Sequence, residues 1–78
     1  MLSFFDAARL NDVAALEGAL AQGTLATATD ENGWTALHHA ATGGAVDAAR
    51  WLLDHGVDAN AADRFGSTPL SRAVFEQQ

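Results

Sequence analysis

Apolar side chains fall at helical spacing along several short segments of this chain, and glycine or small polar residues separate the segments. In the second segment, Val13, Leu16 and Leu20 share one helical face. Asp12 precedes that face with a side chain that can cap a helix, and Gly23 follows it where a helix commonly ends. The same reasoning predicts helices over about residues 3–10, 12–22, 35–42 and 46–55, and a fifth helix that begins at Thr68 and Pro69.

The predicted helices bury narrow apolar faces, so we expect close packing of helix against helix. Trp51 lies at an apolar position of its helical face, and we interpret it as mostly a core residue. Asn11 occupies a turn between two helices, where a left-handed backbone is often needed and asparagine tolerates it. The expected inward side chains are Phe4, Ala7 and Ala8 in the first helix, Ala49, Leu52 and Leu53 in the fourth, and Leu70, Ala73 and Val74 in the fifth.

The order of residues repeats along the chain without gaps. Asp30 and Gly33 return as Asp63 and Gly66, a shift of 33 positions. A period of this size is typical of stacked-repeat proteins, in which each unit buries its apolar side against its neighbours. Asp30-Glu31-Asn32-Gly33 also has the composition of a tight turn, with a short acceptor first and glycine last.

Three stretches carry a resemblance to a known family. They read Asp30-x-x-Gly33-x-Thr35-x-Leu37-His38-x-Ala40-Ala41, Leu52-Leu53-x-x-Gly56-x-Asp58-x-Asn60-Ala61 and Asp63-x-x-Gly66-x-Thr68-Pro69-Leu70. The chain resembles the ankyrin repeat family over nearly its whole length. The resemblance implies an all-α solenoid of helix-turn-helix units with protruding β-turn fingers, about two and a third repeats long. The expected units are residues 1–29 (without an opening finger), 30–62 and 63–78 (partial).

Composition limits the partners that this chain can bind. It has ten acidic and four basic residues and a formal net charge of −6. Phosphate backbones and anionic membranes repel such a chain, so we expect neither nucleic acid nor membrane as a partner. The sequence has no cysteine, no signal-peptide pattern and no apolar stretch long enough to span a bilayer. A cytoplasmic location is the default expectation.

The titratable residues favour structural roles over chemistry. Zinc ligation is not expected, because adjacent His38 and His39 point about 100° apart on a helix and no His-x-x-x-His pair or cysteine accompanies them. Asp30, Asp58 and Asp63 recur with the repeat and are expected to accept hydrogen bonds from turn amides. The family resemblance implies that His38 is a buried residue that hydrogen-bonds Thr35 and the neighbouring finger. We predict no catalytic residue, no metal and no cofactor, and we expect that the chain is not an enzyme.

The leading functional hypothesis is a module that binds another protein on a preformed surface. The family resemblance implies contacts by the finger tips and the concave helix face. Trp34, Phe65 and Phe75 stand out there, because no packing rule of the repeat asks for an aromatic residue and aromatics often anchor interfaces. The acidic balance favours a partner with basic patches. The predicted partner-binding residues are Glu31, Asn32, Trp34, Thr42, Arg64, Phe65, Ser67 and Phe75, with Gly43, Glu76, Arg9 and Leu10 at related positions.

A second hypothesis concerns the third unit, which has no second helix in this sequence to cover Leu70 and Val74. The chain would then be a structural unit that self-associates, as a homodimer, through Leu70, Val74 and Phe75. Two other readings remain open: a fragment of a longer protein, or a complete chain with a frayed end. Terminal repeats normally carry a polar outer face, which is why the uncovered side chains need an explanation.

Overall fold

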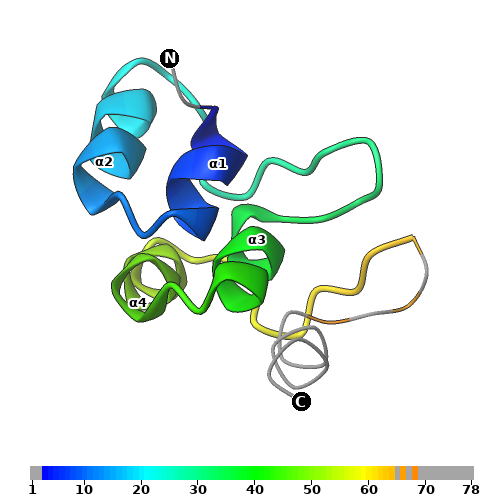
Figure 1. Cartoon of the computed structure of the whole chain (residues 1–78). Helices are drawn as coiled ribbons and strands as arrows, with labels where there is room; N and C mark the ends of the chain where they lie inside the picture. Colours follow the sequence, from blue (N-terminus) through cyan, green and yellow to red (C-terminus); the bar gives the residue numbers. More distant parts are fainter. Residues whose placement is uncertain (1–2, 65, 67, 69–78) are drawn as a thin grey trace.

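The structure is a computed structural model, and it describes residues 3–64, 66 and 68. Its four helices are α1 (Phe4–Arg9), α2 (Val13–Ala21), α3 (Ala36–Gly43) and α4 (Val46–Asp54) (Figure 1). Within the described residues there is no strand, and Thr29 and Thr35 form an isolated antiparallel bridge. The all-α prediction is therefore confirmed. The predicted fifth helix and the proposed site residues Phe65, Ser67, Leu70, Val74, Phe75 and Glu76 lie outside the described residues.

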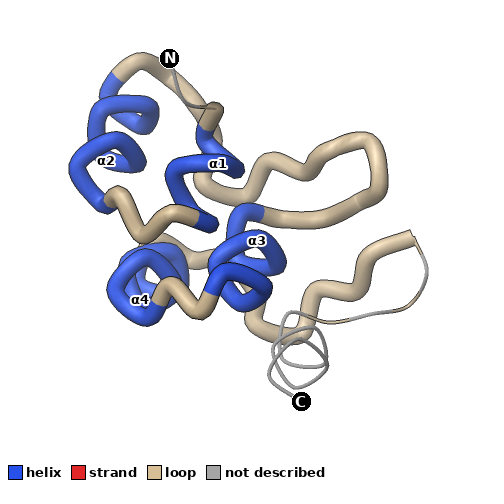
Figure 2. Tube along the Cα trace, viewed as in Figure 1, coloured by secondary structure: helices blue, strands red, loops and turns tan. Residues whose placement is uncertain are grey.

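The two helix pairs stack, and the loops after them extend to one side. α1 packs against α2 and α3, and α3 packs against α4. Residues 24–34, here called finger 1, and residues 57–64, called finger 2, both extend away from α2 and α4 (Figures 1 and 2). The inner helices α1 and α3 thus lie between the outer helices and the fingers. Among the described residues, no helix is long and apolar enough to cross a membrane.

Local sequence sets the beginnings of the first two helices. The Ser3 hydroxyl accepts a hydrogen bond from the Asp6 N–H at 3.0 Å. The Asp12 carboxylate accepts one from the Ala15 N–H at 3.1 Å. Each bond satisfies an amide that the helix itself leaves without a partner. The predicted Asp12 cap is confirmed.

The turn between α1 and α2 also supports a distant helix. Asn11 has a positive φ of 62°, and Gly44 has φ 66° at the equivalent turn between α3 and α4. The N-cap of α4 is Ala45, whose side chain cannot accept a hydrogen bond. The Asn11 side-chain oxygen supplies that bond instead, accepting from the Ala48 N–H at 2.9 Å. One left-handed residue therefore shapes its own turn and caps a helix of the next pair.

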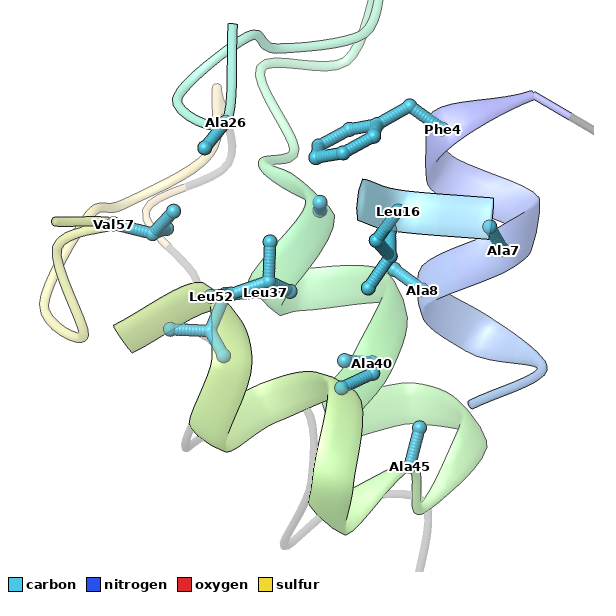
Figure 3. Close-up of a cluster of buried hydrophobic side chains, with 12 residues drawn as sticks. Phe4, Ala7, Ala8, Leu16, Ala26, Leu37, Ala40, Ala45, Leu52 and Val57 are labelled. Carbon is cyan, nitrogen blue, oxygen red and sulfur yellow. The ribbon is translucent and has the colours of Figure 1, made fainter. Parts of the chain in front are cut away.

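The core is a thin layer of small and branched side chains between the helices. Leu16 and Leu52 are fully buried, and Phe4 is 8% exposed at the edge of the same cluster (Figure 3). Trp51 is partly buried against this cluster and meets the Phe4 ring edge-on, with centroids 6.4 Å apart. Its assignment as mostly core is confirmed. The expected burial of Leu53 is wrong: that side chain is 45% exposed. It follows Leu52 by one residue, so it points about 100° away from the core.

Gly43 marks the closest approach of the two inner helices. A Cβ placed on it would lie within contact distance of the Arg9 carbonyl oxygen, so any larger residue would clash with backbone. Gly43 therefore lets α3 end against the end of α1. Gly18 on α2 differs, because an added Cβ there meets nothing within 4 Å.

Candidate functional site

The tip of finger 1 is organised by one carboxylate. Asp30 Oδ1 accepts hydrogen bonds from the N–H of Asn32 at 2.9 Å and the N–H of Trp34 at 3.0 Å. The Gly33 N–H donates to the Asp30 carbonyl at 3.0 Å, and Gly33 adopts φ 78°. That positive φ is the reason why glycine suits the position. The predicted turn role of Asp30 is confirmed.

His39 binds the second oxygen of the same carboxylate. Its Nε2 lies 2.9 Å from Asp30 Oδ2, and the two side chains are 18% and 21% exposed. Partial burial raises the pKa of Asp30, but hydrogen bonds from His39, Trp34 and Asn32 outweigh it, so the pKa falls below its ordinary value of 3.8. An ionised carboxylate only accepts, so the imidazole is the donor. Finger 1 is thereby tied to α3.

Finger 2 lies directly beside the tip of finger 1. The Arg64 N–H donates to the Asn32 carbonyl at 3.1 Å. The Arg64 guanidinium donates to the Glu31 carbonyl at 3.3 Å. A Cβ on Gly33 would lie 3.1 Å from the Arg64 nitrogen, so the two backbones approach closely. Glu31, Asn32 and Arg64 are all exposed, and the fingers present them at fixed spacing.

Trp34 does not stand free on the surface, contrary to the sequence-based expectation. It is partly buried, and its indole N–H donates to Asp63 Oδ2 at 2.6 Å. Its ring stacks on His38, with centroids 5.6 Å apart, and meets His39 edge-on at 5.0 Å. The Trp34 side chain therefore has a packing role in this chain that the sequence did not indicate. Trp34 joins both fingers to α3, and its contact with a partner stays a prediction.

The remaining predicted surface positions divide into exposed and covered ones. Arg9 and Leu10 at the end of α1 are exposed, as is Gly43 on α3. Arg9 pairs with Asp6 at 3.0 Å on the surface of α1. Thr42 is only partly exposed, and its hydroxyl oxygen is buried and makes no hydrogen bond to any residue that the structure describes. The predicted contact of Thr42 with a partner stays a prediction.

His38 has the structural role that the family resemblance implied toward Thr35. Its side chain is fully buried, and Nδ1 accepts a hydrogen bond from the Thr35 N–H at 3.1 Å. The Thr35 hydroxyl lies 3.0 Å from the same nitrogen and accepts from the His38 N–H at 3.4 Å. The reciprocal pair fixes the first turn of α3 at the base of finger 1.

The other acidic residues also serve turns and contacts. Asp58 Oδ1 accepts from the Asn60 N–H at 2.8 Å, as expected for a turn. Asp63 is 6% exposed and bonds the Trp34 indole rather than acting only within its own turn. Residues 3–64, 66 and 68 contain no group of three or more His, Asp or Glu side chains that could hold a metal ion. Sequence reasoning missed the roles of His39 and Asp63. Their partners lie across the fold, and no local motif marks those pairs.

Comparisons with known proteins agree with this architecture. The family described as "Ankyrin repeats (3 copies)" matches residues 4–78. The neurogenic locus Notch protein of Drosophila melanogaster is 54% identical over 56 residues, which is 70% of this chain. The potassium channel AKT3 of Oryza sativa subsp. japonica is 51% identical over 55 residues, again 70% of this chain. The NAD-capped RNA hydrolase NUDT12 of Homo sapiens is 38% identical over 73 residues, or 92% of this chain.

The chain spans only a small part of each of these relatives. It covers 2% of the Notch protein, 6% of the potassium channel and 16% of the hydrolase. The three proteins have different activities, so the shared element is the repeat itself. The hydrolase match gives this chain no catalytic role.

Proposed function

Because the chain belongs to the ankyrin repeat family, we propose that it binds another protein through its finger tips and the adjoining face of α1 and α3. Ankyrin repeats generally mediate protein–protein interaction. The specific surface is our proposal, and its support is the order of the two fingers. A surface that is already ordered loses little conformational entropy on binding, so more of the contact energy becomes affinity.

The observation that carries the proposal is the register between the fingers. Backbone hydrogen bonding from Arg64 to Asn32 fixes the tips relative to each other. The side chains of Glu31, Asn32 and Arg64 remain exposed at these tips, and the Arg64 guanidinium also donates to the Glu31 carbonyl. Asp30 and Trp34 hold this arrangement from beneath, as positioning residues.

Charge on the described surface refines the kind of partner. The exposed charged residues of the outer helices include Glu17, Asp47 and Asp54, with Arg50 as the one exposed cation on α4. The finger tips instead combine Glu31 with Arg64. A partner that docks on the fingers therefore needs mixed charge, and the acidic excess of the outer helices acts mainly through long-range attraction.

Charge reversal on the fingers tests the surface. We expect Glu31→Lys and Arg64→Glu each to weaken the affinity for a partner of the wild-type chain by roughly tenfold or more, because each reversal adds charge repulsion at a contact. The partner is captured with wild-type protein from extract of the cells that carry the sequence, and affinity is then measured with the purified partner.

Two matched variants on the outer helices are the controls. Glu17→Lys and Arg50→Glu make the same charge changes at exposed positions away from the fingers. They should bind the partner nearly as wild type does, apart from a small change in association rate. If the outer variants lose the partner and the finger variants keep it, the proposed surface is wrong.

A further inference from the structure

A single ionised group joins the turn of finger 1 to α3. Asp30 accepts two backbone hydrogen bonds at Oδ1 and the His39 bond at Oδ2, so one carboxylate joins the turn to α3. The apolar core between the helices contains no acidic side chain, and Leu16 and Leu52 are buried there. The carboxylate bonds that order the tip are therefore distinct from the apolar contacts of that core.

We propose that the Asp30–His39 pair is a proton-controlled latch, which fixes the tip of finger 1 when Asp30 is ionised and releases it when Asp30 is protonated. Protonation adds a solvent proton to one carboxylate oxygen and turns that acceptor into a donor. Strong acidification opens the tip while the helix stack remains folded.

Two aromatic rings, one from α1 and one from finger 1, pack against His39 of the pair. Phe5 of α1 lies 5.2 Å from the His39 ring, and Trp34 of finger 1 lies 5.0 Å from it on another side. These rings limit solvent around the pair, and a hydrogen bond to a charged group is stronger where solvent is limited. The latch therefore links α1, α3 and finger 1 at one point.

Other charged groups lie on the elements around the pair, and the experiment must distinguish their effects from that of Asp30. α1 contributes Asp6, which pairs with Arg9. Finger 2 contributes Asp63, bonded to the Trp34 indole, and Arg64, bonded to the Glu31 carbonyl. The charged side chain of Glu31 is exposed. On α3, His38 stacks on the Trp34 ring. Asp63 is the main alternative source of an acid-induced change at Trp34, because its carboxylate accepts the indole hydrogen bond.

The sign of the pH dependence follows from the direction of the shift. The pKa of Asp30 is depressed in the folded chain, so the contribution of the latch is present above the unfolded value of 3.8 and is lost as pH falls through the lower folded value. Desolvation acts the other way but is outweighed by the hydrogen bonds. Tip release is therefore expected only in strongly acidic solution.

Hydrogen exchange at neutral pH tests the latch directly. In Asp30→Asn, the Trp34 and Asn32 N–H groups should exchange about tenfold faster or more, because a neutral amide oxygen accepts their hydrogen bonds more weakly than an ionised carboxylate does. The matched control is Asp58→Asn, which removes the similar turn carboxylate of finger 2 and should leave both amides protected. His39→Gln keeps a donor, whereas His39→Phe keeps only a ring. We expect faster exchange in the phenylalanine variant alone.

An acid titration separates tip release from unfolding. In a Trp51→Phe background, Trp34 is the single tryptophan, and its fluorescence is followed from neutral pH to about pH 2.5 beside far-ultraviolet circular dichroism. The Trp34 signal should change below pH 3.8 while helical dichroism persists. Asp63→Asn should keep the transition, and Asp30→Asn should abolish it.

Either of two results would overturn the latch. The Trp34 signal and the helical dichroism could change together, or Asp30→Asn could keep the transition that Asp63→Asn removes. The effect of the latch on partner binding rests on the proposed function, but these measurements use the free chain. A failure of the finger surface to bind a partner would therefore leave the latch intact, and the reverse also holds.

Discussion

The two helix pairs share one repeat, but their outer helices begin in different ways. α2 is capped by Asp12, the residue directly before it. Ala45 occupies the same place before α4 and makes no side-chain hydrogen bond. Asn11 from the first pair supplies the cap through a bond to the Ala48 N–H. The second pair thus depends on the first for the hydrogen bond that caps its outer helix, whereas the first pair makes the equivalent bond with its own residue.

The pairs also differ in where they place their largest buried side chain. α2 buries Leu16 and has Ala19 one turn later, whereas α4 has Ala49 at the position of Leu16 and buries Leu52 one turn later. Both leucines belong to the same cluster (Figure 3). This exchange of large and small side chains keeps the layer filled, because cores conserve volume more strictly than residue order.

The largest expected effect comes from emptying the core of the second pair. Leu52→Ala should lower the free energy of unfolding by about 2–5 kcal/mol, because a fully buried side chain leaves a cavity. Leu16→Ala should cost a similar amount. Leu53→Ala is the control and should cost less than about 1 kcal/mol. Urea denaturation followed by circular dichroism measures all three, and equal losses at Leu52 and Leu53 would contradict the assigned helix faces.

The next effect concerns the two helical glycines. Gly43→Ala should destabilise the fold by about 1–3 kcal/mol, since its methyl group meets the Arg9 backbone. Gly18→Ala should instead stabilise it by about 0.5–1 kcal/mol, because alanine favours helix and the site is open. Opposite signs in thermal unfolding support the close approach of α1 and α3. If both Gly43→Ala and Gly18→Ala stabilise the fold, then α1 and α3 do not approach each other closely at Gly43.

The smallest effect tests the shared cap. Asn11→Gly permits the left-handed turn but removes the side chain, and should cost about 1 kcal/mol. Adding Ala45→Ser should recover most of that loss, because serine caps α4 from its own position. In wild type, where the Asn11 side-chain oxygen already accepts from the Ala48 N–H, Ala45→Ser should give no gain in stability. Equal effects of Ala45→Ser in both backgrounds would mean that Asn11 does not cap α4.

Features within one turn of the chain were predictable. Asp12 and Thr35 cap helices through bonds that reach three residues along the chain. Asn11 and Gly33 adopt the positive φ that their side chains allow. The turn role of Asp30 followed from the same local chemistry. Such contacts depend on neighbours in sequence, so the pattern of residue types was enough to identify them.

The candidate site was less predictable, because its residues meet across the fold. Trp34 was expected as a free surface aromatic, yet it bonds Asp63 in the next finger. The His39 bond to Asp30 spans nine positions and joins a helix to a finger tip. None of these contacts has a local signature.

By itself, the sequence determined the repeat, the helices and the turns between them, because their bonds close within a few residues and their apolar faces recur at fixed spacing. The tertiary structure alone decided which side chains remain exposed. Packing of one finger on the next buries part of Trp34 and leaves Glu31 and Arg64 outward. Exposure depends on what lies nearby in space, and the stacking of units sets that distance.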